Sequence, residues 1–259
     1  MSMLPIKRFI FITRFRLIIN YLFFCYRIKF LNRKNLIRYL LIIGPESLGI
    51  VLLTACFIGI VFTLQIVKEF LYLNVSSSLG AILSLAFVRE LSPVLTTVIL
   101  TGKIGSSFAA ELATMKITEQ IDALYLLRVE PIFYLVFPRL LACLFMLPCL
   151  NMIFLFTSLS SSLFTCFIFY NVHPSIFLYS TFIALSIKDF IKSIIKTICF
   201  SFLVSIVSCL FGLTVEGGSK SVGQATTSAV VFILLFVFIL DCILTYFLFN
   251  QVGSIIKKI

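Results

Sequence analysis

The feature that most constrains this chain is a series of uninterrupted apolar stretches, several of which reach the roughly 20 residues that a helix needs to cross a hydrocarbon core of about 30 Å. Only 12% of the residues are charged, and the mean hydropathy is +1.17. A water-soluble domain of this composition would aggregate. The sequence therefore predicts an all-α integral membrane protein.

The apolar stretches predict about five crossings. Residues 157–187 leave a sixth crossing or a re-entrant segment open, because an apolar run is followed there by polar residues around His173 and Pro174. Positive charge also complicates the count, since Lys188, Lys192 and Lys196 lie before or at the start of the fourth predicted span, on the side that five crossings place outside. The predicted spans cover approximately residues 47–67, 79–107, 132–156, 194–213 and 225–249.

The first 45 residues form a distinct basic segment, before a membrane domain at residues 46–259. The segment has no acidic residue, so we expect it on the cytoplasmic or equivalent side, as a helix at the membrane surface whose basic side chains reach toward anionic headgroups. Its basic residues are Lys7, Arg8, Arg14, Arg16, Arg27, Lys29, Arg33, Lys34 and Arg38.

A polar island at residues 106–130 interrupts the apolar pattern. It carries four of the ten acidic residues of the chain, and we expect a surface helix over approximately residues 109–127. At about 100° per residue, Glu111, Met115, Glu119 and Asp122 fall within roughly 80° of one another. Such a helix would offer an acidic face to a partner.

The second predicted span contains charge at a depth where charge is costly. Arg89 and Glu90 lie about ten residues into this span, and a central ionisable group costs on the order of 3 kcal/mol by insertion scales. One interpretation is that both side chains meet headgroups at the membrane surface. The other places them on the wall of a polar or amphiphilic cavity, with Pro93 bending the helix.

Two glycine-rich passages give no nucleotide site. Residues 101–107 superficially resemble a phosphate-binding loop but lack its spacer and its Ser or Thr after the lysine, so Gly102 and Gly105 are predicted to permit close helix packing. In the second passage, Gly217, Gly218 and Gly223 are predicted to form a turn between the last two spans. The eight cysteines include no C-x-x-C pair, and we expect neither a metal site nor a cofactor in this chain.

Several motifs in order resemble one family. The chain reads V-R-E-L-S-P-V-L-T at residues 88–96, T-G-K-I-G-S-S at 101–107, E-L-A-T-M at 111–115 and V-G-Q-A-T-T-S-A-V-V at 222–231. From about residue 40 to the end it resembles the MlaE-type permeases of lipid ABC transporters. Its G-G-S-K-S-V-G at 217–223 is most similar to the cyanobacterial and plastid branch, which includes the permease of the plastid trigalactosyldiacylglycerol lipid importer. Ser92 and Lys103 depart from the family pattern, where glycine and arginine are usual.

The resemblance implies a homodimeric permease that binds two copies of a separate ABC ATPase and an MCE-domain substrate-binding protein, and that moves glycerophospholipid between membranes. ATP would be bound by the partner ATPase, and no nucleic acid is expected. Arg89, Glu90 and Pro93 become candidates for the lipid path. The polar island becomes the coupling helix, with Glu111, Met115, Glu119, Gln120, Asp122 and Leu124 as its candidate docking residues.

Other classes stay open beside this one. An ion-coupled secondary transporter or channel would usually show internal repeats, and we find no convincing repeat. A membrane scaffold would explain the hydrophobicity but not a patterned acidic helix. The abundance of Phe, Ile, Lys and Asn suggests an AT-rich coding genome, which together with the branch resemblance points to the plastid inner envelope, with a bacterial inner membrane as the alternative.

Overall fold

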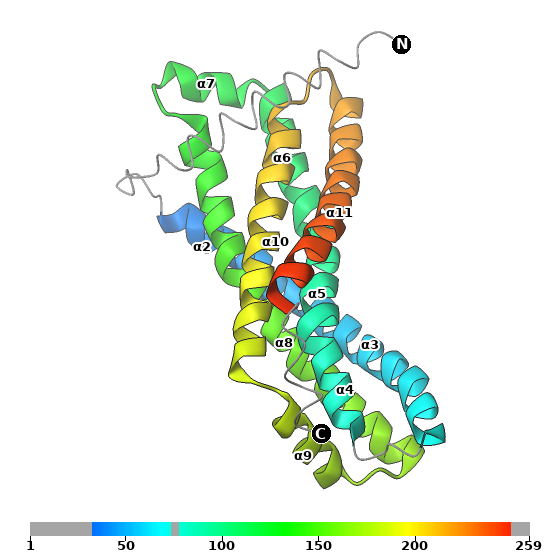
Figure 1. The fold of residues 1–259 in the computed structure, drawn as a ribbon. Coiled ribbons are helices and arrows are strands. Elements are labelled where there is room, and N and C mark those ends of the chain that lie inside the picture. The colour runs from blue at the N-terminus through cyan, green and yellow to red at the C-terminus, as the bar shows by residue number, and fades with distance from the viewer. Residues whose placement is uncertain (1–32, 74–77, 250–259) are drawn as a thin grey trace. The chain divides into compact units, whose positions relative to one another are not determined.

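The computed structural model describes residues 33–73 and 78–249, and each regular element within these ranges is a helix (Figure 1). Five helical segments of the described chain are long and apolar enough to cross a membrane. The prediction of an all-α integral membrane protein with about five transmembrane helices is therefore confirmed. Residues 1–32 of the predicted basic segment lie outside the described residues. The five segments are Arg33–Tyr72, Leu79–Ile117, Ile132–Tyr170, Ile187–Leu213 and Ser219–Phe249.

The first segment consists of α2 (Arg33–Ile43) and α3 (Pro45–Tyr72). Pro45 stands at the start of α3, where its fixed φ suits a helix and its missing N–H costs nothing. Glu46 in the first turn is favourable at the positive end of the helix dipole. Local sequence thus accounts for the boundary between the two helices.

The second and third segments contain turns that are wider than an α-helix. Such π-type turns are often found at functional sites because they displace side chains from the regular α-helical register. In the second segment α4 (Leu79–Ala86), η3 (Phe87–Leu91), α5 (Ser92–Leu100), η4 (Thr101–Gly105) and α6 (Ser106–Ile117) follow one another. The third segment begins with η5 (Ile132–Val136) and continues as α8 (Phe137–Tyr170).

The third segment is longer than the predicted span, because α8 continues to Tyr170 with Pro148 inside it. The next helix, α9 (Pro174–Ala184), has 11 residues, which is too short to cross a membrane. The described residues thus give five long segments and one short apolar helix, and no sixth crossing. The remaining elements are α7 (Gln120–Leu126), α10 (Ile187–Leu213) and α11 (Ser219–Phe249).

The described chain divides into two compact units, and each is considered by itself. The first unit contains residues 33–43, Leu100–Met146 and Ser201–Phe236. In its core, Leu112, Ile121 and Val136 pack together with Leu135 and Cys209. A Cβ added at Gly212 would lie 2.6 Å from the Cβ of Leu112, so α6 and α10 approach each other as closely as glycine permits.

The second unit contains Gly44–Ile99, Leu147–Phe200 and the described residues from Val237 onward. A Cβ added at Gly59 of α3 would lie 2.6 Å from the carbonyl oxygen of Ser158 in α8, and one at Gly80 of α4 would meet the carbonyl oxygen of Phe177 in α9. Glycine at these two positions lets the backbones approach. The main core cluster of the second unit comprises Val67, Leu79, Leu83, Phe87, Cys166 and Phe177.

Candidate functional site

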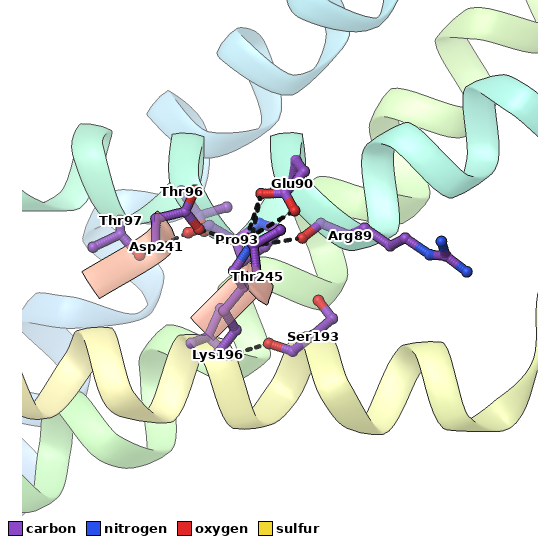
Figure 2. A network of polar contacts seen from close by, with 10 residues as sticks. Arg89, Glu90, Pro93, Thr96, Thr97, Ser193, Lys196, Asp241 and Thr245 are labelled. Atoms are coloured by element: carbon purple, nitrogen blue, oxygen red, sulfur yellow. Dashed lines mark hydrogen bonds and ion pairs between the residues drawn. The ribbon is translucent and has the colours of Figure 1, made fainter. Parts of the chain in front are cut away.

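Arg89 and Glu90 lie in η3 of the second unit, and Figure 2 shows their side chains pointing in different directions. The Arg89 guanidinium pairs with Asp189 of α10, with Nη2 3.1 Å and Nε 3.3 Å from Oδ1. The Ser186 hydroxyl donates to the other carboxylate oxygen of Asp189 at 2.5 Å. Arg89 therefore has an acidic partner at the start of α10.

Glu90 belongs to a second cluster, whose centre is the ammonium group of Lys196 in α10 (Figure 2). The Lys196 side chain is fully buried, and its Nζ donates to Glu90 Oε2 at 2.7 Å and to Thr245 Oγ1 at 2.8 Å. Thr245 in turn donates to Glu90 Oε1 at 3.0 Å. One buried cation thus connects η3, α10 and α11.

A second carboxylate, that of Asp241 in α11, also lies beside Lys196. Its Oδ1 is 2.7 Å from Nζ, which is the distance of an ion pair, although the direction of approach does not suit a hydrogen bond. Attraction between opposite charges depends on distance much more than on direction, so we regard this contact as an ion pair. Lys196 consequently shares one positive charge between two carboxylates.

Pro93 has a consequence for hydrogen bonding that the sequence analysis did not predict. Because proline has no N–H, it cannot donate to the carbonyl four residues before it, which belongs to Arg89. The Lys196 ammonium donates to this carbonyl oxygen at 3.0 Å. Pro93 therefore leaves an acceptor free that a side chain of another helix satisfies.

An aromatic ring also meets this group of cations. The ring centroid of Phe249, at the end of α11, lies 5.1 Å from Arg89 Cζ, 5.0 Å from Lys192 Nζ and 5.8 Å from Lys196 Nζ. Such distances allow cation–π attraction with the ring face. The second unit thus contains a polar cluster, formed by Arg89, Glu90, Asp189, Lys196, Asp241 and Thr245, inside otherwise apolar helices.

Sequence reasoning identified Arg89 and Glu90 but missed the partners that hold them. The three lysines were expected before or at the start of the fourth span, whereas α10 already includes Lys188 and the structure buries Lys196. Two signals were available: lysines spaced four residues apart fall on one helix face, and Asp241 is the one acid of an apolar stretch at residues 225–249.

The polar island of the first unit is not the single helix that was predicted over 109–127. Helix α6 ends at Ile117, Glu119 adopts a left-handed conformation with φ of 57°, and α7 then begins at Gln120. Lys116 and Asp122 pair across the break at 3.0 Å. The predicted common face is therefore wrong, because the change of direction separates Glu111 and Met115 from the residues of α7.

The candidate docking residues divide into two groups. Glu119, Gln120 and Asp122 are exposed, whereas Met115 and Leu124 pack against the core of the first unit. Glu111 pairs with buried Arg139 of α8. The sequence analysis also missed three exposed residues at the end of α7 and just beyond it, namely Tyr125, Leu126 at 86% exposure and Leu127 at 72%.

The predicted glycine roles are met in part. Gly217 has φ of +118°, which an L side chain rarely adopts, and it precedes α11 in a turn. A Cβ at Gly105 would lie 3.2 Å from Ile233 Cδ1, in agreement with close packing. Gly102 has no neighbour within 4 Å of such a Cβ in the described structure, so close packing does not explain it. Gly218 directly precedes α11 as predicted for a turn, whereas Gly223 lies inside α11, so its predicted place in the turn is wrong.

Comparison with known proteins identifies the class of this chain. The family model for permease MlaE matches residues 36–247. The probable ABC transporter permease protein ycf63 of Pyropia yezoensis is 55% identical over 227 residues, which cover 88% of this chain and 86% of that protein. The chain belongs to the MlaE permease family, as its motifs indicated.

Two further relatives extend the comparison. The probable ABC transporter permease protein slr1045 of Synechocystis is 44% identical over 224 residues, or 86% of this chain and 85% of that protein. The chloroplastic protein TRIGALACTOSYLDIACYLGLYCEROL 1 of Arabidopsis thaliana is 42% identical over 225 residues, or 87% of this chain and 64% of that protein. The chain is thus a multi-pass membrane permease, and its relatives from Pyropia and Synechocystis are named as probable ABC transporter permeases.

Proposed function

We propose that this chain is the membrane subunit of an ABC transporter that moves glycerophospholipid between membranes, driven by ATP hydrolysis on a separate subunit. It would work as a homodimer, together with an MCE-domain substrate-binding protein, in the plastid inner envelope or in a bacterial inner membrane. The observation that carries the proposal is the match to the MlaE permease family over residues 36–247. The Arabidopsis relative, whose name contains that of a galactolipid and the word chloroplastic, supports a lipid substrate and a plastid location.

The polar cluster of the second unit supports a path for an amphiphile. A phospholipid has long apolar chains and one charged head, so its path needs apolar walls with few polar anchors. The helices of this unit supply such walls, and the Glu90 side chain remains 40% exposed although it contacts Lys196. Arg89 and Glu90 are therefore proposed to line or gate the lipid path, with Pro93 freeing the Arg89 carbonyl for Lys196.

A direct test compares labelling with transport. Photo-crosslinking groups placed at positions 89 and 90 should label with a lipid probe, and the double variant Arg89→Gln, Glu90→Gln should reduce lipid transfer more than it reduces assembly. Strong labelling at neighbouring apolar positions but none at 89 and 90, together with normal transport by the double variant, would show that the two charges are structural only.

The end of α7 supports an ATPase-docking surface in the first unit. Residues 119–127 combine two exposed acids, Glu119 and Asp122, with the exposed apolar side chains of Tyr125, Leu126 and Leu127. Protein interfaces typically combine an apolar centre with a polar rim. Movement of the partner ATPases upon ATP binding would then act on α7 and rearrange the membrane helices. We retain Gln120 in this surface because it is exposed between the two acids.

Charge reversal tests this surface. Glu119→Lys together with Asp122→Lys should weaken binding of the ATPase subunit, since charge pairs across an interface can couple by about 1.5 kcal/mol or more. The membrane helices should remain folded. Glu69→Lys, which reverses an exposed acid of α3, serves as the matched control and should leave binding unchanged. Equal affinity of the double variant and the control would exclude these acids from the docking surface.

Co-purification distinguishes the proposal from the other classes. A nucleotide-binding subunit should come down with this chain and support ATP-dependent lipid transfer in proteoliposomes. An ion-coupled transporter or channel would transport without that subunit, and a scaffold would not transport at all.

A further inference from the structure

The largest fully buried side chain of the described structure belongs to Arg139, in the first turn of α8. Its Nη2 lies 2.6 Å from Oε2 of Glu111 in α6, and its Nη1 donates to the carbonyl oxygen of Leu135 at 2.8 Å. Both contacts lie in the first unit. An arginine is seldom fully buried unless it is paired, so the ion pair with Glu111 allows Arg139 to be buried.

Two aromatic rings complete the surroundings of Arg139. Its Cζ lies 4.7 Å from the ring centroid of Tyr39 in α2 and 5.6 Å from that of Phe108 in α6. The two rings meet edge to face, with centroids 5.7 Å apart and an interplanar angle of 82°. One guanidinium therefore connects α2, α6 and α8, three elements that are distant in sequence.

Glu111 lies close to the end of α6 that connects to α7. Helix α6 ends at Ile117, fewer than two turns beyond Glu111, and the chain reaches α7 immediately after the break at Glu119. A force applied to α7 therefore acts on the end of α6. The short ion pair between Glu111 and Arg139 connects this end of α6 to the first turn of α8.

We infer that Arg139 and Glu111 are positioning residues that pass the displacement of α7 into the third membrane segment. This inference rests on the proposed function, because it assumes that an ATPase pushes on α7. It assigns Glu111 to the inside of the coupling machinery, whereas Glu119 and Asp122 belong to its outer, docking surface. The pair acts after docking, so its loss should separate ATP hydrolysis from lipid transfer.

One hydrogen-bond donor of Arg139 remains unused among the described residues. Its Nε is buried and has no hydrogen-bond partner in the described structure, although both terminal nitrogens are engaged. An unsatisfied buried donor costs free energy. Packed helices transmit motion by changing between discrete arrangements, and the unused Nε leaves Arg139 one donor for a partner in a second arrangement.

The test uses the full-length chain in complex with its ATPase subunit, reconstituted into proteoliposomes. Arg139→Gln, Glu111→Gln and the double variant are compared with wild type for ATPase affinity, ATP hydrolysis and lipid transferred per ATP. We expect affinity to change by no more than about twofold, and transfer per ATP to fall by about tenfold in each single variant. The double variant should fall no further than the singles, because the two residues act as one unit.

Three further variants keep the test decisive. Arg38→Gln removes an exposed charge from the neighbouring position of Tyr39 and should leave coupling unchanged. Arg139→Lys, which can still pair with Glu111, should retain intermediate coupling. Arg139→Met combined with Glu111→Leu removes both charges but keeps apolar volume, so it should fold even where a single variant leaves a charge unpaired.

The outcomes separate the inference from the proposed function. Unchanged transfer per ATP in the folded Met and Leu double variant overturns the inference. The inference is also overturned if the variants of Arg139 and Glu111 lose ATPase affinity in proportion to their loss of transfer, because the pair would then belong to the docking surface. A wild-type chain that binds no ATPase refutes the proposed function as well, whereas normal wild-type coupling with normal variants refutes the inference alone.

Discussion

Removal of the Lys196 ammonium should destabilise the second unit more than any other single loss of charge in that unit. The fully buried Nζ contacts two carboxylates at 2.7 Å and also donates to Thr245 and to the Arg89 carbonyl. Lys196→Met keeps much of the volume but leaves Glu90 and Asp241 without their cation. Breaking a buried ion pair in this way costs about 3–5 kcal/mol.

The partial exposure of the acids places the expected cost at the lower end of that range. The Glu90 side chain is 40% exposed and that of Asp241 is 18% exposed, so solvent or headgroups can compensate part of the lost pairing. We therefore expect a loss of about 3 kcal/mol. For a domain of about this size, that corresponds to a decrease of about 6–12 °C in thermal midpoint.

Thermal unfolding in detergent, followed by the monodisperse fraction after heating, measures this effect. Lys188→Met is the matched control, because Lys188 is an exposed lysine of the same helix and its loss should change stability by no more than about 0.5 kcal/mol. Adding Glu90→Gln and Asp241→Asn to Lys196→Met should recover part of the stability, since the unpaired charges are then gone. If Lys196→Met unfolds at the same temperature as Lys188→Met, the reasoning about a shared buried cation is refuted.

Three other outcomes are expected. Gly59→Val should destabilise the α3–α8 contact by about 1–3 kcal/mol, because a Cβ there would lie 2.6 Å from the Ser158 carbonyl oxygen, whereas Gly49→Val, with no neighbour within 4 Å of that Cβ, should cost less in the same thermal assay. Leu126→Ser should lower ATPase affinity in a pull-down titration without changing the thermal midpoint, because Leu126 is 86% exposed and contributes little to the core. The chain purified alone should show no specific ATP hydrolysis, and sustained turnover abolished by a point change at residues 102–107 would contradict the permease assignment.

The number of long helices could be predicted from the sequence, because span length and low charge are properties of local segments. The ends of the helices could not be predicted in the same way. Helix α8 continues to Tyr170 through Thr157 and a run of serines, whose hydroxyls bond to carbonyls of the preceding turn, such as Ser162 to Ser158 at 2.8 Å. These bonds let polar residues remain inside a membrane helix, and hydropathy alone reads them as an end.

The break between α6 and α7 was missed for a related reason. Helix ends are usually read from glycine or proline, and neither occurs near Thr118 and Glu119. The left-handed Glu119 costs free energy that tertiary contacts must offset, including burial of Ile121 in the core of the first unit and the pair between Lys116 and Asp122. Periodicity within one segment contains no information about such contacts.

The paired charges show which part of this fold hydropathy does not determine. Lipid tails are as apolar as the helices, so burial of Leu and Phe gives little preference for one arrangement of neighbouring helices over another. A buried cation does give such a preference, because it requires its acid at one position. Arg139 fulfils this role in the first unit and Lys196 in the second, each joining segments that are distant in sequence. The charges that make the chain expensive to insert therefore also restrict how its helices can pack, and changes at these positions should alter coupling and stability before they alter the number of spans.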